Sequence, residues 1–119
     1  MTRSQGLDEA RAFIEAHFNE PLTLEQMAAR AKLSISRFAT AFRQRFGSSP
    51  YRYLCAVRIE RAQSLLLKGV PSVEVAAEVG FFDQSHFGRH FKRWCGMTPT
   101  TFVARSRGTL PPTPRTIQP

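Results

Sequence analysis

The sequence predicts an all-α protein of about seven helices, in which one helical unit occurs twice and a long helix joins the two copies. Seven residues recur identically 49 positions later, with no gap: Glu25 and Glu74, Ala28 and Ala77, Ser36 and Ser85, Phe38 and Phe87, Phe42 and Phe91, Gly47 and Gly96, Pro50 and Pro99. Apolar residues recur at helical spacing, and no segment alternates as a strand. Each copy therefore reads as a helix-turn-helix.

The first two helices are predicted from apolar spacing and from capping residues. Apolar side chains at helical intervals indicate an amphipathic helix over Leu7–Phe18, which Pro21 ends. Thr23 followed three residues later by Gln26 is the pattern of a capping box. It predicts a short second helix that runs to about Ala31.

The next helix carries a row of phenylalanines on one face. Ser34 is a suitable N-cap, and Phe38, Phe42 and Phe46 follow at intervals of four residues. Gly47 suits the left-handed position just past a helix end. We expect this ladder to pack in the core, and the opposite face to be exposed.

A long connector helix is predicted after this unit. Ser49 and Pro50 form a cap followed by proline in the first helical turn, where its missing N–H costs nothing. Apolar residues sustain the helix over about 50–68, until Gly69 and Pro71 stop it.

The second unit repeats this pattern of capping residues and apolar spacing. Ser72 is expected to cap a helix that ends at Gly80, and Asp83 to cap another that carries Phe87 and Phe91 inward. Trp94 is also assigned to the core.

A short last helix closes the second unit. Gly96 ends the preceding helix, and Thr98 with Pro99 opens a helix through Phe102. The predicted organisation is one domain over 7–105, with a first lobe (7–49), the connector (50–68) and a second lobe (70–105), followed by a disordered Pro-rich tail (106–119).

The charge balance points to a polyanionic partner. The 119 residues include 17 Lys and Arg against 9 Asp and Glu, a net charge of +8. Such a field attracts nucleic acid, although composition alone does not separate DNA from RNA or an anionic membrane. No run approaches a membrane span and no signal peptide is recognisable, so a cytoplasmic protein without a membrane partner is expected. Cys55 and Cys95 lie in apolar helical contexts and are expected to be buried and free.

Several motifs together carry a family resemblance. They are Ala76-Ala77-Glu78-Val79-Gly80-Phe81, Asp83-Gln84-Ser85-His86-Phe87, Arg89-His90-Phe91-Lys92, Gly96-Met97-Thr98-Pro99, and the connector residues Pro50, Tyr53-Leu54, Arg58-Ile59, Ala62 and Leu65-Leu66. Over roughly 7–105 the chain resembles the DNA-binding domain of the AraC/XylS family of bacterial transcription regulators. This resemblance implies homeodomain-like three-helix lobes whose recognition helices enter neighbouring major grooves of promoter DNA. It also implies a nearby RNA polymerase, activation of transcription and a separate sensor domain.

The chain departs from the family at two places. Val103 stands where the family usually has Arg, and Ala39 and Thr40 are small where other members place longer side chains. These departures affect one phosphate contact and the strength of base readout by the first recognition helix.

The exposed faces of the two recognition helices supply the candidate DNA contacts. They are Ile35, Ser36, Arg37, Ala39, Thr40 and Arg43 in the first unit, and Gln84, Ser85, His86, Gly88, Arg89 and Lys92 in the second. Arg suits guanine, Gln suits adenine, small apolar groups suit thymine methyls, and Arg43 and Lys92 suit phosphates. Gly88 would let the backbone approach the groove. The alternative is a solvated helix face, which the recurrence of this face in both units disfavours.

Phosphate contacts are predicted at helix starts and on the connector, at Thr23, Arg52, Ser72 and Thr98. Arg58 could reach the backbone or pair internally with an acid such as Glu74 or Glu78. The connector spans roughly 27 Å at about 1.5 Å per residue, less than the roughly 34 Å of one DNA turn. We therefore expect the duplex to bend.

Two other classes of function are open to a chain of this composition. His86 and His90 have the i, i+4 spacing of metal ligands, with Cys95 five residues on, but a zinc hydrolase needs a third ligand and a general base. No catalytic pattern is present, so no enzyme, metal or cofactor is expected. An RNA- or protein-binding helical module is the other alternative, and its exposed aromatics are not expected here.

The start of the chain, residues 1–6, is short and polar and reads either as a linker or as a native terminus. We expect a monomer, which a missing sensor domain could convert into a dimer. The target sequence, the regulated genes and the inducer are not encoded in any recognisable pattern.

Overall fold

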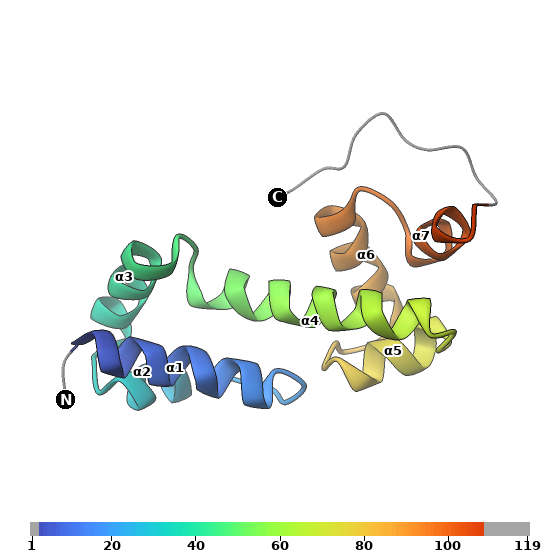
Figure 1. The fold of residues 1–119 in the computed structure, drawn as a ribbon. Coiled ribbons are helices and arrows are strands. Elements are labelled where there is room, and N and C mark those ends of the chain that lie inside the picture. The colour runs from blue at the N-terminus through green and yellow to red at the C-terminus, as the bar shows by residue number, and fades with distance from the viewer. Residues whose placement is uncertain (1–2, 109–119) are drawn as a thin grey trace. The chain divides into compact units, whose positions relative to one another are not determined.

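The computed structural model describes residues 3–108 and folds this part of the chain into seven α-helices without a strand (Figure 1). The helices are α1 (Arg3–His17), α2 (Leu24–Ala31), α3 (Ile35–Phe46), α4 (Pro50–Leu67), α5 (Ser72–Glu78), α6 (Gln84–Cys95) and α7 (Pro99–Ser106). The chain divides into two compact units between Val57 and Arg58, so α4 contributes its first part to one unit and its second part to the other. The predicted all-α fold with two helix-turn-helix subdomains is confirmed.

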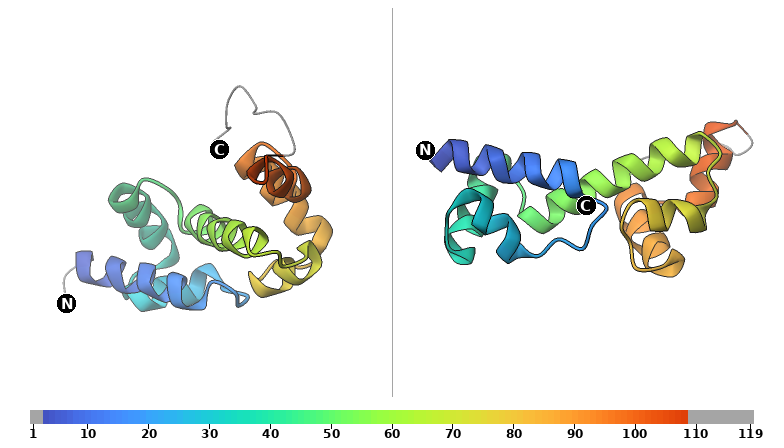
Figure 2. Two further views of the ribbon diagram at one scale, coloured as in Figure 1. Left: turned by 45° about the vertical axis from the view of Figure 1, so that its right-hand side comes forward. Right: turned by 90° about the horizontal axis from the view of Figure 1, so that it is seen from below.

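The first unit packs α1, α2, α3 and the start of α4 around one core. This core consists of Leu7, Ala10, Ile14, Met27, Ala28, Ala31, Phe38, Ala41, Phe42 and Leu54. The ring of Phe42 lies 5.5 Å from that of Phe38, 4.6 Å from that of Phe46 and 5.8 Å from that of Tyr53. The predicted phenylalanine ladder is therefore the centre of this unit, and Figure 2 shows α1 and α2 lying against each other.

Helix α1 begins earlier than predicted, at Arg3 and not at Leu7. Residues 3–6 are therefore helical and do not form a linker. Gly6 is buried, and a Cβ at this position would lie 2.7 Å from the carbonyl oxygen of Ala31. The absence of a side chain lets α1 approach the end of α2 closely.

Polar contacts between helices also hold this unit together. The guanidinium of Arg45 lies 3.1 Å from the carboxylate of Asp8, and the hydroxyl of Tyr53 donates to the carboxylate of Glu15. Both pairs are solvent-exposed, so each adds at most about 1 kcal/mol. Burial of the phenylalanine ladder is the dominant stabilising term.

Three of the predicted capping motifs in the first unit are present. The hydroxyl of Thr23 accepts from the backbone N–H of Gln26 at 3.1 Å, and the Gln26 side chain accepts from the Thr23 N–H at 2.9 Å. Ser34 accepts from the N–H of Arg37 at 3.2 Å, and Gly47 ends α3 with φ 83°. These local signals explain why the bounds of α2 and α3 follow from the sequence.

The second unit has a core of its own. Helix α6 packs against α5 and α7. The buried apolar side chains of this unit come from the second part of α4, from α5, from the turn after α5 and from α6: Ile59, Ala62, Leu66, Val75, Ala76, Val79, Phe81, Phe87, Phe91 and Cys95. Pro99 of α7 is buried as well. The Phe91 ring lies 5.4 Å from the Phe102 ring of α7. Trp94, which was expected in the core, is partly buried.

Ser72 is not the N-cap of α5. It is the first helical residue, Pro71 holds the cap position, and no side chain accepts a hydrogen bond there. The prediction was wrong because it transferred the cap from Thr23 at the constant offset of 49. The cap of α2, Thr23, corresponds in the structure to Pro71, which lies 48 positions later.

The repeat therefore changes register between its two helices. The carbonyl of Ala28 accepts from the N–H of Leu33 at 3.1 Å, and the carbonyl of Ala76 accepts from the N–H of Phe81 at 3.0 Å. Both alanines are buried, whereas Ala77, the partner at offset 49, is exposed. The first helices of the two units correspond at offset 48 and the second helices at offset 49.

One extra residue in the second turn accounts for this change. In the first unit the left-handed residue Lys32 (φ 57°) is followed by Leu33 and then by the cap Ser34. In the second unit the left-handed Gly80 (φ 87°) is followed by Phe81, by Phe82 and only then by the cap Asp83. Phe81 takes the place of Leu33, so Phe82 is the inserted residue.

The last helix is longer than predicted. Thr98 caps α7 and Pro99 is its first residue, as expected, but the helix continues past Phe102 to Ser106. The predicted disordered tail lies outside the described residues, except that Ser106 ends α7 and Arg107 and Gly108 follow it.

Both cysteines are buried and free, as predicted. The Sγ of Cys95 accepts from the side-chain amide of Gln63 at 3.2 Å, and burial raises the pKa of the Cys95 thiol. No helix among residues 3–108 combines the length and apolar character that a membrane crossing requires.

Candidate nucleic-acid interface

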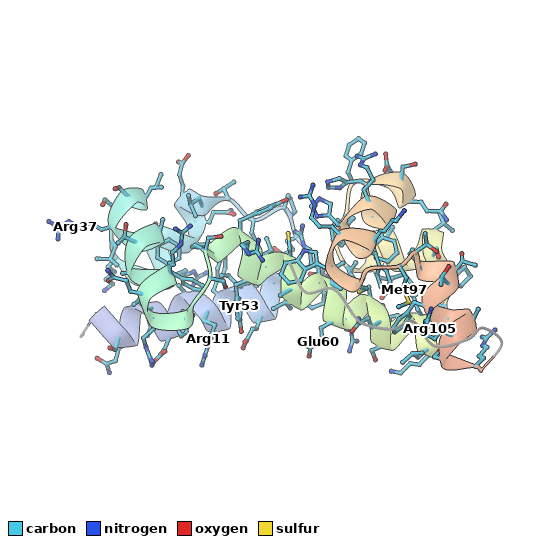
Figure 3. All side chains as sticks on the ribbon, turned by 90° about the horizontal axis from the view of Figure 1, so that it is seen from above. Arg11, Arg37, Tyr53, Glu60, Met97 and Arg105 are labelled. Atoms are coloured by element: carbon cyan, nitrogen blue, oxygen red, sulfur yellow. The ribbon has the colours of Figure 1, made fainter. Side chains whose placement is uncertain are left out.

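Helix α3 separates a buried face from a polar, basic one. It buries Phe38, Ala41 and Phe42 against the core. The predicted contact residues lie on the other side: Ile35, Ser36, Arg37, Thr40 and Arg43 are exposed, and Ala39 is partly exposed. Figure 3 shows Arg37 pointing away from its unit. The α3 surface thus offers two guanidiniums, two hydroxyls and small apolar groups together.

Helix α6 has the same division. It buries Phe87, Phe91 and Cys95, and the predicted contact residues again lie mainly on the open side: Gln84, Ser85, Arg89 and Lys92 are exposed, and His86 and Gly88 are partly exposed. Asp83 caps the helix by accepting from the N–H of His86 at 2.7 Å. The structure therefore brings each predicted set together on one helix face.

The imidazole rings of His86 and His90 on α6 lie edge to face, with their centroids 4.5 Å apart. The Nε2 atoms of His86 and His90 lie 3.1 Å apart, and the Nδ1 of His86 accepts from the backbone N–H of Phe82 at 3.4 Å. Phe81 packs against both rings, with centroids 5.6 Å and 5.2 Å away.

The pKa of His90 is lowered by its burial, and further by the charges of His86, Arg93, Arg89 and Arg58. In the unfolded chain His90 has its ordinary pKa of about 6.5. As the pH falls below that value, the unfolded chain therefore binds more protons than the folded chain. The stability that neutral His90 supports is present above the unfolded pKa and lost as the pH falls towards the folded one.

Replacing His90 should therefore flatten the pH dependence of folding. We expect the free energy of unfolding to fall less between pH 7.5 and pH 5.5 in His90→Gln than in the original chain. Urea titrations at the two pH values measure this difference. An unchanged difference would show that His90 does not titrate with folding.

Gly88 occupies an open position within α6. A Cβ there would meet no atom within 4 Å, so only the helix propensity changes on substitution. Gly88→Ala should raise the free energy of unfolding by about 1 kcal/mol. Gly6→Ala is the matched contrast, because its Cβ would lie 2.7 Å from a backbone oxygen and should destabilise the fold. Denaturant titration compares the two, and a destabilised Gly88→Ala variant would contradict the open position.

The predicted phosphate contacts differ in what they offer. Thr23 and Thr98 are exposed N-caps, but the Thr98 hydroxyl already accepts from the N–H of Thr101 at 3.2 Å, and Thr23 is occupied by its capping box. Arg52 is exposed on α4. Ser72 does not cap α5 but is its first residue, so it still lies at a helix start, which is the basis of its predicted phosphate contact.

Arg58 is an internal residue. Its side chain is 7% exposed, and its guanidinium lies 5.6 Å from the centroid of the Phe81 ring. Of its two possible roles, the burial favours the internal one. Across the described residues, no three His, Cys, Asp or Glu side chains gather closely enough to hold a metal ion.

Two residues beside the α6 face were missed from the sequence. Arg93 is exposed and lines a small hollow with Arg89 and His90. Phe82 is 88% exposed and precedes the cap of α6. The periodicity of α6 could have indicated Arg93, one turn from Arg89, whereas Phe82 is recognisable only once the register of the turn is known.

Known proteins share this fold and its sequence pattern. The family model described as a helix-turn-helix domain matches residues 27–105. The transcriptional activator RhaS of Klebsiella pneumoniae is 34% identical over 94 residues, which cover 78% of this chain and 34% of RhaS. The regulator GbdR of Pseudomonas aeruginosa is 31% identical over 99 residues, which cover 82% of this chain and 27% of GbdR. The chain thus spans about a third of the length of these relatives.

Solved structures agree with this assignment. The DNA-binding domain of the global transcriptional factor AdpA, solved in complex with a target DNA, superposes with a TM-score of 0.81 at 34% identity, over 86% of this chain and 93% of that one. The C-terminal domain of AraT, a response regulator from Geobacillus stearothermophilus, has a TM-score of 0.82 at 31% identity, over 88% of each chain.

The matched family and its named members are DNA-binding transcription regulators, which confirms the predicted class and the expectation that this is not an enzyme. The chain therefore belongs to the AraC/XylS family of transcription regulators, as an AraC-type DNA-binding domain with two helix-turn-helix motifs.

Proposed function

We propose that this domain reads an asymmetric duplex DNA site by inserting α3 and α6 into neighbouring major-groove segments. One observation carries the proposal: α3 and α6 bury equivalent phenylalanines and expose equivalent faces that differ in their residues. Helices of this kind enter the major groove with one exposed face towards the bases. Because the two faces differ, the two half-sites must differ as well.

Each exposed side chain is assigned to the group that its chemistry suits. Arg37 and Arg89 each donate two hydrogen bonds to a guanine, and Gln84 pairs with an adenine. Ile35, Ala39 and the Thr40 methyl pack on thymine methyls, while Ser36, Ser85 and His86 supply shorter polar contacts. Arg43 and Lys92 bind phosphates.

The backbone of the DNA is held by further groups. Arg52 and the helix starts at Thr23, Ser72 and Thr98 are the remaining phosphate contacts that we propose, and Arg93 beside Arg89 adds a further cation. Gly88 leaves room for the α6 backbone near the groove, so Gly88→Ala should weaken binding to the preferred duplex although it stabilises the fold.

The length of α4 bears on the shape of the bound DNA. Its 18 residues span roughly 27 Å at about 1.5 Å per residue, which is shorter than the roughly 34 Å of a DNA turn. We propose that the duplex bends so that both helices engage it, at a cost of a few kcal/mol. A structure with one unit disengaged on straight, specific DNA would contradict this.

The same proposal includes the cellular location, the partners and the oligomeric state of the domain. We assign it to a cytoplasmic regulator that binds promoter DNA close to RNA polymerase and activates transcription. The domain itself is expected to be monomeric in sedimentation experiments, and a dimer would arise through a sensor domain. The domain that we assign to this role covers residues 7–105.

Selection from a random duplex library tests the function. The enriched sequence is then titrated across salt concentrations against a scrambled duplex and a matched RNA. A gapped, asymmetric motif with two elements about one turn apart supports the proposal. Equal, steeply salt-dependent binding to all three would mean that the basic surface alone acts, and would overturn it.

A further inference from the structure

Phe82 differs from every other phenylalanine of this chain. All ten lie within the described residues; nine are buried or partly buried, and Phe82 is 88% exposed. Among the described residues, the other exposed large apolar side chains keep more of their surface covered, the nearest in exposure being Val73 at 59% and Leu67 at 54%. The extent of its exposure sets Phe82 apart as a side chain available for a contact outside the fold.

The fold does not need Phe82. The first unit makes the same turn with one residue fewer, and there the cap Ser34 follows directly on Leu33. In the second unit Phe81 performs the packing role of Leu33: it is 5% exposed and lies 5.5 Å from the Phe87 ring. The inserted residue adds nothing to the core.

The turn nevertheless holds Phe82 in a defined place. Its backbone N–H donates to the Nδ1 of His86 at 3.4 Å, and the N–H of His86 donates to the next residue, Asp83, at 2.7 Å. The first bond ties Phe82 itself to the first turn of α6, and the second ties its neighbour Asp83 to that turn. This is the end of a recognition helix whose residues reach base edges.

We propose that Phe82 is a specificity-determining residue whose ring packs on the methyl group of a thymine at the edge of the base pairs read by α6. The inference rests on the function proposed above. Thymine is the base that presents an apolar group in the major groove, and a phenylalanine ring is a suitable contact for it. Gln84, two residues on, reads the neighbouring base pair by hydrogen bonds, so the start of α6 combines polar and apolar readout.

The two units then differ in how they make apolar contacts. In the first unit Ile35, 43% exposed, lies in the first turn of α3, and no residue corresponds to Phe82. In the second unit the apolar contact is made by Phe82, which lies before the N-cap of α6 and therefore outside the helix. This difference adds to the asymmetry of the site.

A double-mutant cycle between protein and DNA tests the contact. Selection with the original chain and with Phe82→Ala identifies the position at which a thymine preference is lost. That thymine is then replaced by deoxyuridine, which lacks the methyl group, and the dissociation constants of all four combinations are measured. Removal of either the ring or the methyl should weaken binding about fourfold, the value of one buried methyl-sized group, and removal of both should cost no more than removal of one.

Controls separate the possible failures. Phe82→Ala should unfold at the same temperature as the original chain because the ring is exposed, and Leu67→Ala, which removes another exposed apolar side chain of this unit (54% exposed), should retain the thymine preference. If the original chain selects a motif and Phe82→Ala selects the same one with the same affinity, the thymine contact is wrong and the ring is left for a protein partner. If the original chain selects no motif, the proposed function fails.

Discussion

Phe42→Ala should lower the free energy of unfolding by about 3–5 kcal/mol. The side chain is fully buried and its ring contacts those of Phe38, Phe46 and Tyr53, which come from the same helix and from α4. Truncation removes these contacts and leaves a cavity between helices that cannot collapse without moving α4. A loss of this size is a large part of the stability of a small domain.

Denaturant titration followed by circular dichroism measures this loss. Ile35→Ala is the matched control, since it also removes an apolar side chain from α3 but from a position that is 43% exposed. It should change the stability by about 0.5 kcal/mol or less. Equal effects of the two substitutions would mean that the phenylalanine ladder is not the centre of the first unit.

Arg89→Ala should cost about 1–3 kcal/mol of binding free energy at the preferred duplex and relax the preference at one base pair. The residue is exposed on α6, one turn from His86 and on the same face as Ser85 and Lys92. A bidentate contact to guanine discriminates between bases, so its loss weakens binding to the preferred sequence and leaves other sequences almost unchanged.

Lys92→Ala is the companion variant, because it removes a neighbouring charge from the same exposed face. It should weaken all sequences similarly and reduce the steepness of the salt dependence by about one unit. Fluorescence anisotropy with the preferred and single-base-changed duplexes separates the two patterns. An Arg89→Ala variant with unchanged affinity and preference would remove Arg89 from the base-reading set.

Local signals in the sequence were sufficient for most helix bounds. The Thr23 capping box, the Ser34, Asp83 and Thr98 caps and the glycine after α3 all act within one turn of the residue concerned, so their effects can be predicted without the fold. The phenylalanine rows fixed which faces of α3 and α6 are exposed. The composition of the candidate interface followed from those rows.

The register of the second turn could not be obtained in this way. Ala28 can be aligned with Ala76 or with Ala77, because the two alanines are adjacent and the identity is the same in either case. Only the burial of Ala76 and its hydrogen bond to Phe81 decide between them. The misplaced cap at Ser72 and the overlooked Phe82 both follow from this one ambiguity.

Tertiary contacts explain the other differences. The extension of α1 to Arg3 places Gly6 against Ala31. No local sequence pattern predicts such a close approach of two helices. Arg58 is similar, since a cation in a basic chain suggests the surface until Phe81 is seen beside it. Such residues depend on partners distant in sequence, which spacing alone does not identify.

The unequal turns suggest a route by which a duplicated unit acquires a new preference. Two identical copies would read the same bases twice, and each later substitution on a recognition helix would change one contact already in use. Lengthening the turn leaves both helices untouched, since Ala76 keeps the place of Ala28 and Phe87 keeps the place of Phe38. The added residue makes no contact in the core, so it can be substituted without loss of folding stability. We therefore expect a substitution at position 82 to change the DNA preference with little loss of folding stability.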